Sequence, residues 1–307
     1  MPKFLRKEDG VALVLFAILL PVILGCTALV VDFGLQYGSK VRLQNIAQAA
    51  ALAAAQDAGE SSSLAYDKAC EYLSLNGVEE DEAQIDISQS EPSASITITR
   101  EADYYFGRIL GFRTADVSAR AKAVSVGLSS FTGAAPLGVL FDDFVYGQKY
   151  TLKCGAPPEI GAGNFGALRL SGSGATAYED DLKHGYPGKL EVGDIVETKP
   201  GNMSGPTERA IDYRFAQDTR VPPNTFDDFD RDAPQILYVP VIEPYEVSGT
   251  HIQSVRILGF AAFFVTGVPG SGNESEIEGY FVKTVKSGTG GESQANYGVV
   301  TCKLVDF

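Results

Sequence analysis

The sequence predicts an α+β fold: an N-terminal transmembrane helix extended into a long helix, a small α/β unit, and then a mainly antiparallel β domain. Three observations predict it. An uncharged apolar run lies near the N-terminus, an alanine-rich run follows it, and short β-rich runs separated by Gly, Pro, Asn and Asp clusters fill the remainder. The expected boundaries are 1–33 (cytoplasmic tip and anchor), 34–127 (extracytoplasmic helix and small α/β unit) and 128–307 (β-rich extracytoplasmic domain).

The predicted membrane anchor is the apolar run at residues 11–31. These 21 positions carry no charge, which at about 1.5 Å per residue is enough to cross a hydrocarbon core of about 30 Å. Asp32 follows the run directly, whereas three bases precede it: Lys3, Arg6 and Lys7. The positive-inside rule therefore predicts a single pass with the N-terminus in the cytoplasm and the later domains outside.

Two alternatives to a retained anchor stay open. A charged start followed by an apolar run is also typical of a cleaved signal, although this run is longer than a usual signal core and no clear A-x-A site follows it. Ile23 to Cys26 reads Ile-Leu-Gly-Cys, which is typical of lipidation at Cys26. The chain stays apolar after Cys26, which favours the retained helix.

An alanine-rich run after the anchor predicts that the helix continues outward to about Gly59. Eight alanines lie between Ala47 and Ala58, and alanine has the highest helix propensity. Small side chains allow close approach either of another helix or of this chain's own folded domain, and the sequence leaves both possibilities open.

The pattern from Gly10 to Ala55 resembles the N-terminal segment of the Flp/Tad pilus-assembly proteins of the TadG-like (TadE/TadG) family. Its marks occur in order: the apolar span, Val-Asp-Phe-Gly at 31–34, Arg-Leu-Gln-Asn at 42–45, and then the Ala-Ala-Ala-Leu-Ala run. The resemblance implies protein partners in a pilus assembly complex. Processed pilins carry a glutamate five residues after the cleavage glycine, whereas Leu15 stands at that distance from Gly10, so an anchored accessory protein is favoured over a processed subunit.

The resemblance continues more weakly to about Val126, and thus covers about two fifths of the chain. We expect strands near residues 84–88 and 94–99, a short helix, and a strand at 116–126. In the last of these, alanine and valine alternate with polar residues, a period-two pattern typical of a half-buried strand. Family members often carry a von Willebrand A module, but this chain is too short to hold one after the N-terminal region.

From about Leu128 the sequence predicts an antiparallel sandwich or barrel in which helical patterning is almost absent. The run Ile257 to Val265 is apolar but only nine residues long, well short of a membrane span. It is expected to be a central strand buried on both faces. The expected strands are LGVLF, KYTLKC, ALRLS, DIVET, ILYVPVI, SVRILGFAAFFVT, GYFVKTV and YGVVTCKLV.

Composition argues against several classes of function. A formal net charge of −14 would repel phosphate backbones, so no nucleic acid partner is expected. Only His184 and His251 are present, and none of the four cysteines forms a CxxC pair, which argues against zinc and thioredoxin-like sites. Cys154 and Cys302 lie in strand-like runs and either form a disulfide or remain two buried thiols.

Three short motifs are similar to known sites. Residues 161–166 match GxGxxG, but prolines precede them and a strand-like run follows, which favours a turn over a cofactor loop. Asp86, Ser88 and Ser90 match the metal loop of von Willebrand A modules, yet a strand ending in a turn fits their neighbours better.

The third motif places Asp228, Asp230 and Asp232 at D-x-D-x-D spacing, which hard cations favour. Ala233 and Val239 stand where an EF-hand loop needs Gly and Glu, so a solvated acidic loop is favoured. The sequence thus predicts no catalytic, cofactor-binding or metal-binding residues and no small-molecule cofactor.

Taken together, these observations predict a non-catalytic, membrane-anchored accessory or structural component of a Tad (Flp) type pilus assembly or secretion apparatus. The alternative is a surface-anchored adhesin or binding module that uses the same anchor. An envelope hydrolase is a third class, but no GxSxG, HExxH or other nucleophile-and-base pattern supports it.

Overall fold

The computed structural model describes residues 7–140, 144–153, 165–199, 203–249, 251–268, 276–291 and 295–306. Within it the chain forms two compact units. The first comprises Met1–Val124 together with Leu304–Phe307, and the second comprises Ser125–Lys303. Strand β3 (Thr114–Thr132) begins in the first unit and ends in the second. Each unit is described by itself.

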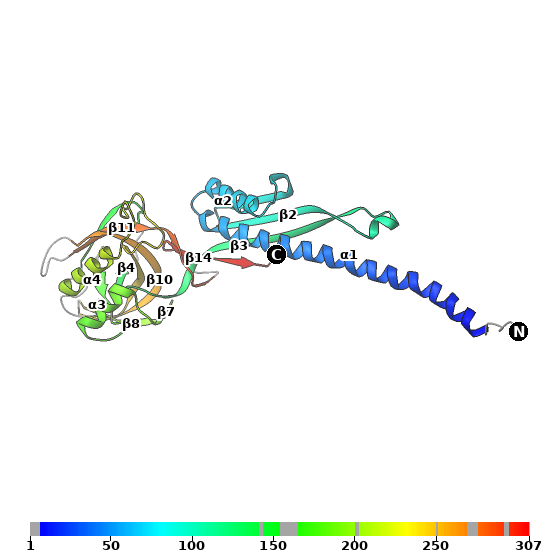
Figure 1. The fold of residues 1–307 in the computed structure, drawn as a ribbon. Coiled ribbons are helices and arrows are strands. Elements are labelled where there is room, and N and C mark those ends of the chain that lie inside the picture. The colour runs from blue at the N-terminus through cyan, green and yellow to red at the C-terminus, as the bar shows by residue number, and fades with distance from the viewer. Residues whose placement is uncertain are drawn as a thin grey trace. The chain divides into compact units, whose positions relative to one another are not determined.

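The first unit consists of one long helix, a short second helix and antiparallel strands that belong to a larger sheet (Figure 1). The first helix continues through Pro21 without a break. At 51 residues it is about 75 Å long at 1.5 Å per residue. The elements are α1 (Lys7–Asp57), α2 (Ser62–Leu75), η1 (Glu80–Glu82), β1 (Ala83–Ser88), β2 (Ser93–Asp103), η2 (Gly107–Leu110) and the start of β3.

The alanine-rich end of α1 packs against the chain's own domain. Ala47, Ala50, Ala51, Ala54 and Ala55 are fully buried, and α1 contacts both α2 and β2. Because alanine adds almost no side-chain bulk, the helices approach closely. Of the two possibilities that the sequence left open for these alanines, the structure therefore supports packing within the chain.

Helix α2 is an element that the sequence-based expectation missed. Its N-cap residue Ser61 accepts a hydrogen bond from the backbone N–H of Leu64 at 3.3 Å, a recognised helix-start signal. Ala65, Ala69 and Leu73 are its buried residues and lie four apart, on one face. The helix is short and its apolar stripe narrow, so its stability depends on packing against α1 rather than on its own composition.

The expected strands of the first unit are confirmed, with longer bounds. β1 pairs antiparallel with β2, and β2 pairs antiparallel with β3 from Ser93↔Val124 to Asp103↔Thr114. Val117, Ala119, Ala121 and Ala123 are buried, whereas the residues between them are more exposed. The period-two pattern thus places one face of β3 in the core.

The second unit is built mainly of strands and, in its described residues, carries two helices (Figure 1). Its main sheet has the order β5-β11-β10-β9-β4-β6, with β8 paired to β10. Most pairings are antiparallel, but β4 pairs with β9, and β12 with β14, in parallel. The elements are β4 (Leu137–Leu140), β5 (Lys149–Lys153), β6 (Phe165–Ala167), α3 (Ala175–His184), β7 (Lys189–Glu191), β8 (Ile195–Glu197), α4 (Ser204–Ala216), β9 (Ile236–Ser248), β10 (His251–Gly267), β11 (Glu276–Val282), β12 (Thr284–Val285), β13 (Thr289–Gly290) and β14 (Val299–Val305).

Helices α3 and α4 correct the expectation that this half is almost without helical patterning. Both are short and rich in polar residues, and each turns only a few side chains inward, such as Tyr178 and Leu182 of α3 and Ile211 of α4. Tyr178 donates to or accepts from the Thr207 hydroxyl at 2.9 Å, which joins the two helices. A stripe this narrow gives a weak periodic signal in the sequence.

The long apolar strand β10 is buried on both faces, as expected. Phe263 and Val265 belong to a core that includes residues of α3 and α4. Phe260 and Phe264 belong to a second core that includes the end of β3 and β7. Because one layer covers each face, the strand needs no polar alternation, which explains its continuous apolar run.

Candidate functional site

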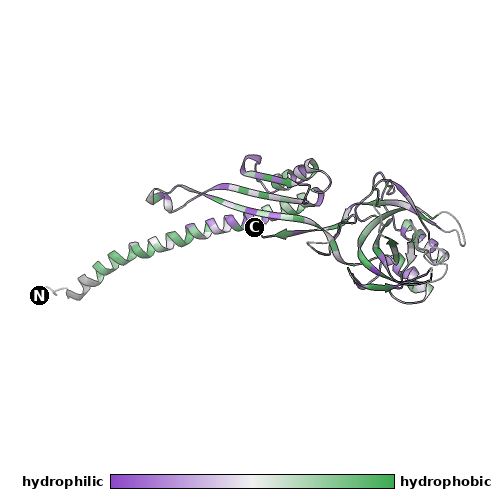
Figure 2. Ribbon diagram, turned by 180° about the vertical axis from the view of Figure 1, so that it is seen from behind, coloured by the Kyte–Doolittle hydropathy of each residue, from purple (hydrophilic) through white to green (hydrophobic). Residues whose placement is uncertain are grey.

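The N-terminal part of α1 exposes its apolar side chains. Leu13, Phe16, Ile18 and Val30 are between 62% and 73% exposed, and Figure 2 shows this part of α1 as hydrophobic. Among the residues that the structure describes, α1 is the one helix long and apolar enough to cross a membrane. Cys26 lies inside it and is exposed.

Asp32 is the first charged residue after the apolar run, and it is 5% exposed. Its carboxylate accepts hydrogen bonds from three consecutive backbone N–H groups, those of Tyr105 (2.9 Å), Phe106 (3.1 Å) and Gly107 (2.7 Å). We call this contact the Asp32 junction. It attaches α1 to the turn that joins β2 to β3, more than 70 residues away in the chain.

The Asp32 junction satisfies groups that the turn cannot pair internally. The three N–H groups lie at the start of η2, where a helical turn leaves its first donors without backbone acceptors. A carboxylate is a strong acceptor for such donors, and successive amides of a turn form an anion-binding concavity. The buried charge of Asp32 is therefore compensated by backbone dipoles rather than by a base.

Two glutamines of α1 continue this contact along the hairpin β2–β3. Gln36 donates to the backbone carbonyl oxygens of Ala102 (3.3 Å) and Asp103 (3.4 Å), and Gln44 donates to that of Arg120 (2.8 Å). Together with Asp32 they form a series of contacts between α1 and the hairpin. Residues of α1 that are closer to the membrane span contact hairpin residues that are closer to the turn. The hairpin therefore runs along α1 with its turn toward the anchor.

An ion pair also holds strand β2 of the hairpin. Arg100 donates to both carboxylate oxygens of Glu82, at 2.6 Å and 2.5 Å, and to the backbone carbonyl oxygen of Gly77 at 2.6 Å. These hydrogen bonds lower the pKa of Glu82 to about 2. β2 is thus fixed at two places, by Asp32 of α1 near its turn and by Glu82 of η1 near its middle.

The sequence did not identify Asp32 as a functional residue except as a mark of the family resemblance and as the end of the span. A signal was present, because a carboxylate directly after 21 uncharged residues is unusual within a helix. Its partners could not be found from the sequence, since backbone amides of a distant turn have no sequence signature.

The motif at residues 86–90 is a strand that ends in a turn. Asp86 and Ser88 lie on β1, and the hydroxyls of Ser88 and Ser90 are 3.3 Å apart. The Ser88 hydroxyl also accepts the backbone N–H of Glu91 at 3.4 Å. These contacts account for the motif by local turn geometry.

The three aspartates of the D-x-D-x-D motif face protein bases. Arg220 donates to both carboxylate oxygens of Asp228 at 2.7 and 2.8 Å and lies 3.8 Å from Asp230, while Lys286 donates to Asp232. The three carboxylates are therefore divided between two bases. Among the described residues no three His, Cys, Asp or Glu side chains are grouped as a metal ion would need.

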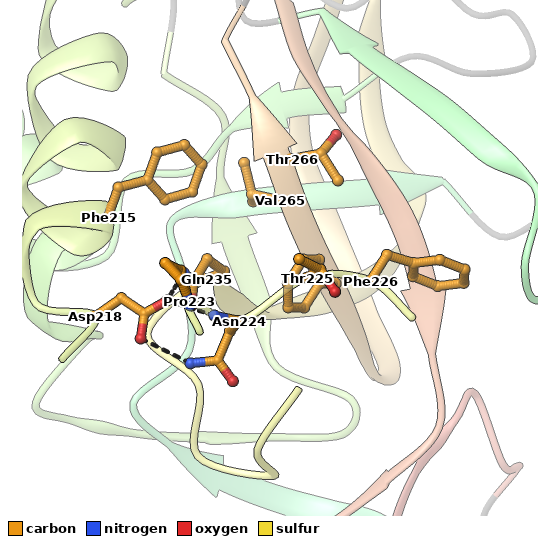
Figure 3. A pocket seen from close by; sticks show the side chains of 10 residues that line it. Phe215, Asp218, Pro223, Asn224, Thr225, Phe226, Gln235, Val265 and Thr266 are labelled. Atoms are coloured by element: carbon orange, nitrogen blue, oxygen red, sulfur yellow. Dashed lines mark hydrogen bonds between the residues drawn. The ribbon is translucent and has the colours of Figure 1, made fainter. Parts of the chain in front are cut away.

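A pocket of about 430 Å³ lies between the end of α4, the loop after it and β10. Figure 3 shows that Asp218 accepts hydrogen bonds from the side chains of Asn224 and Gln235 in this pocket. The hydrogen bond from Gln235 is the main cause that lowers the pKa of Asp218 to about 2. The polar side chains of the pocket thus stabilise the loop after α4 by hydrogen bonds to their shared carboxylate partner, Asp218. The rest of the pocket lining is mainly aromatic and aliphatic and includes Phe215 and Phe226.

A second pocket, of about 440 Å³, includes Arg214, Lys286, His184 and Asp232 in its lining. Arg214 donates to the backbone carbonyl oxygens of Leu182 (2.6 Å), Pro234 (3.0 Å) and Ile236 (3.3 Å), and burial lowers its pKa to about 10. Lys286 lies over the ring of Tyr238. Arg214 of α4 thus joins its helix to α3 and to the start of β9, and Lys286 packs on β9 through Tyr238.

The remaining sequence-based interpretations fall partly beyond the described residues. Cys154 lies outside them, so the two alternatives for Cys154 and Cys302, a disulfide or two buried thiols, both stay open. Residues 161–164 of the GxGxxG match also lie outside, while Phe165 and Gly166 belong to β6. Gly10 lies within α1.

The fold and the Asp32 junction define a class: a protein with one N-terminal candidate membrane helix that extends into the core of its first unit, followed by a β-rich unit. A family model is more particular about the N-terminal region. Residues 10–57 match the putative Flp pilus-assembly TadE/G-like family, which confirms the resemblance in the N-terminal region. The match nearly coincides with α1 and indicates a protein related to Flp pilus assembly.

No curated protein and no solved structure matched the chain.

Proposed function

We propose that this protein is a membrane-anchored, non-catalytic structural component of a Flp (Tad) type pilus assembly or secretion apparatus. In this proposal residues 1–33 form the cytoplasmic tip and anchor. Residues 34–127 and 128–307 are extracytoplasmic parts that meet protein partners of the assembly. One observation carries the proposal, namely the match of residues 10–57 to the pilus-assembly family.

The way α1 is used supports this proposal. The helix exposes apolar side chains over its first half and buries alanines in its second half. A single rigid helix would thus connect the bilayer directly to the core of the first extracytoplasmic unit. Such a connection suits a protein that must hold a domain at a fixed height above the membrane, as an assembly component does.

The first experiment tests the role in assembly. Deletion of the gene in its native host is expected to abolish or strongly reduce surface filaments, counted by electron microscopy. Expression of the full chain from a plasmid should restore them. A chain in which a cleaved signal replaces residues 1–33 is the matched control and should be exported without restoring filaments. Normal filaments in the deletion strain would contradict the proposal.

A second experiment tests the orientation. Alkaline phosphatase fused after Phe307 is expected to be active, and the same enzyme fused before Met1 is expected to be inactive, because it folds only outside the cytoplasm. The positive bases before the span and Asp32 after it motivate this expectation. The reverse pattern of activity would place the β-rich unit in the cytoplasm and exclude the proposed role.

The binding-module alternative rests on the pocket lined by Phe215, Phe226 and Phe264, since aromatic walls suit recognition of a ligand. The deletion strain separates the two functions. Filaments that assemble normally while the cells lose attachment to surfaces would favour the binding module over the assembly component.

A further inference from the structure

The turn of the hairpin β2–β3 carries apolar side chains that the described residues of its own unit leave exposed. We call residues 104–113 the hairpin tip. Four of its side chains are exposed, three of them by more than half: Tyr105 (69%), Phe106 (43%), Ile109 (82%) and Phe112 (64%). A soluble protein rarely concentrates so many large apolar groups on one short turn, and such a patch marks a contact surface.

The Asp32 junction fixes the height of this tip. Tyr105, Phe106 and Gly107 are bonded to the residue that directly follows the uncharged run of α1. Gln36 and Gln44 meet positions progressively farther from the tip. With α1 in a bilayer, the tip must therefore lie at the boundary of the hydrocarbon core.

The chemistry of the tip matches that boundary. Arg108 and Arg113 are its charged residues, and residues 104–113 contain no acid, although the chain as a whole has a net charge of −14. Arg108 is exposed and pairs with Asp103 at 2.5 Å. Aromatic rings favour the interface, and arginine side chains reach from apolar surroundings to lipid phosphates.

Helix α1 presents the same kind of side chain at the same height. Phe33 is 68% and Tyr37 is 71% exposed, and they lie within about 8 Å along the helix axis from Asp32 at 1.5 Å per residue. Aromatic residues of the helix and of the tip thus occupy one level. A second copy of the chain bound to the hairpin tip would explain why the tip is apolar. It would not explain why the tip lies level with the end of the membrane span.

We propose that the hairpin tip inserts into the interfacial layer of the bilayer that holds α1, so that the first unit touches the membrane at two places. Ile109 and Phe112 enter the acyl boundary, and Arg108 and Arg113 contact lipid phosphates. Two contacts would fix the tilt and rotation of the unit, which a single helix leaves free. The inference rests on the membrane anchoring within the proposed function.

The chain contains no tryptophan, so Ile109→Trp introduces a unique fluorescent probe. The full-length variant is reconstituted into vesicles that contain anionic lipid and lipids brominated near the carbonyl end of the acyl chains. The expected result is a blue-shifted emission that the brominated lipids quench. Leu75→Trp is the matched control, because Leu75 is 77% exposed in the same unit at the end of α2, and its emission should be red-shifted and unquenched.

Carbonate extraction of the same vesicles distinguishes failure of the α1 membrane anchor from failure of the hairpin tip to insert. A chain that resists extraction while the emission of the Ile109→Trp variant stays red-shifted and unquenched overturns the inference and leaves the anchor intact. Emission that is blue-shifted but unquenched also overturns it, because a protein surface then covers the tip. Extraction of the chain by carbonate overturns both the anchor and the inference.

Discussion

The carboxylate of Asp32 accepts the backbone N–H of Gly107 at 2.7 Å, and this contact joins the end of the candidate membrane span to the turn of a hairpin 75 residues later. Tyr105 and Phe106 donate to the same carboxylate. The three backbone N–H groups at the turn of the hairpin therefore share one carboxylate of α1 as their acceptor.

We predict that Asp32→Ala releases the hairpin tip from α1. Three N–H groups lose their acceptor, so amide hydrogen exchange at residues 105–107 should become faster by roughly tenfold or more, the factor that corresponds to losing a hydrogen bond to a charged acceptor. Asp32→Asn keeps one oxygen acceptor and should have an intermediate effect.

Asp116→Ala serves as the control for this experiment, since it removes an exposed carboxylate from β3 of the same hairpin. Its exchange rates at residues 105–107 should stay as in the wild type. Unchanged exchange in Asp32→Ala would show that the turn does not need the carboxylate.

The buried alanines of α1 should not tolerate a larger side chain. Ala50 is fully buried, so Ala50→Leu is expected to destabilise the first unit by about 1–3 kcal/mol through overpacking. Ala49 is exposed on the same helix, and Ala49→Leu should change stability by less than about 0.5 kcal/mol. Urea unfolding of the full chain in detergent, followed by circular dichroism, measures both.

Stability of the first unit should depend on pH through Glu82. Its pKa is about 2 in the folded chain against an ordinary 4.5, chiefly because Arg100 donates to it. A lowered folded-state pKa means that the contribution is fully present above about pH 4.5 and is lost as the pH falls toward 2. Unfolding measured from neutral pH down to about pH 2.5 should show this loss in the wild type.

Glu82→Gln should remove this part of the pH dependence and destabilise the chain at neutral pH by about 1 kcal/mol, a figure reduced for solvent screening of the partly exposed pair. Glu71→Gln is the control, because Glu71 pairs with Lys68 on the surface, where both side chains are more exposed. It should cost less than about 0.5 kcal/mol. An equal loss for both variants would contradict the role given to Arg100.

Gly279 permits the close pairing of β11 with β10. A Cβ there would lie 2.1 Å from the carbonyl oxygen of Phe264 and 2.7 Å from the ring of Phe263. Gly279→Ala should therefore destabilise the second unit by more than about 3 kcal/mol. At Gly267 a Cβ meets nothing within 4 Å, so Gly267→Ala is the control and should stay within about 0.5 kcal/mol. Thermal unfolding of both full-length variants tests the difference.

The sequence by itself determined the elements whose signal is local. The 21 uncharged residues and the alanine run predicted one helix to about Gly59, and the structure ends α1 at Asp57. Alternating Ala and polar residues predicted β3, and the apolar run 257–265 predicted a central buried strand. Each of these follows from composition and period alone, because helix propensity and burial pattern act over neighbouring residues.

Only the tertiary structure decided the contacts and the marginal elements. Helices α2, α3 and α4 have narrow apolar stripes and form because α1 or the sheet covers them. In the Asp32 junction the partners are backbone groups of a distant turn. Asp228 pairs with Arg220, and Asp232 pairs with Lys286, which lies far away in the sequence. Such pairings depend on how the chain folds back on itself, and short-range sequence patterns do not predict these long-range contacts.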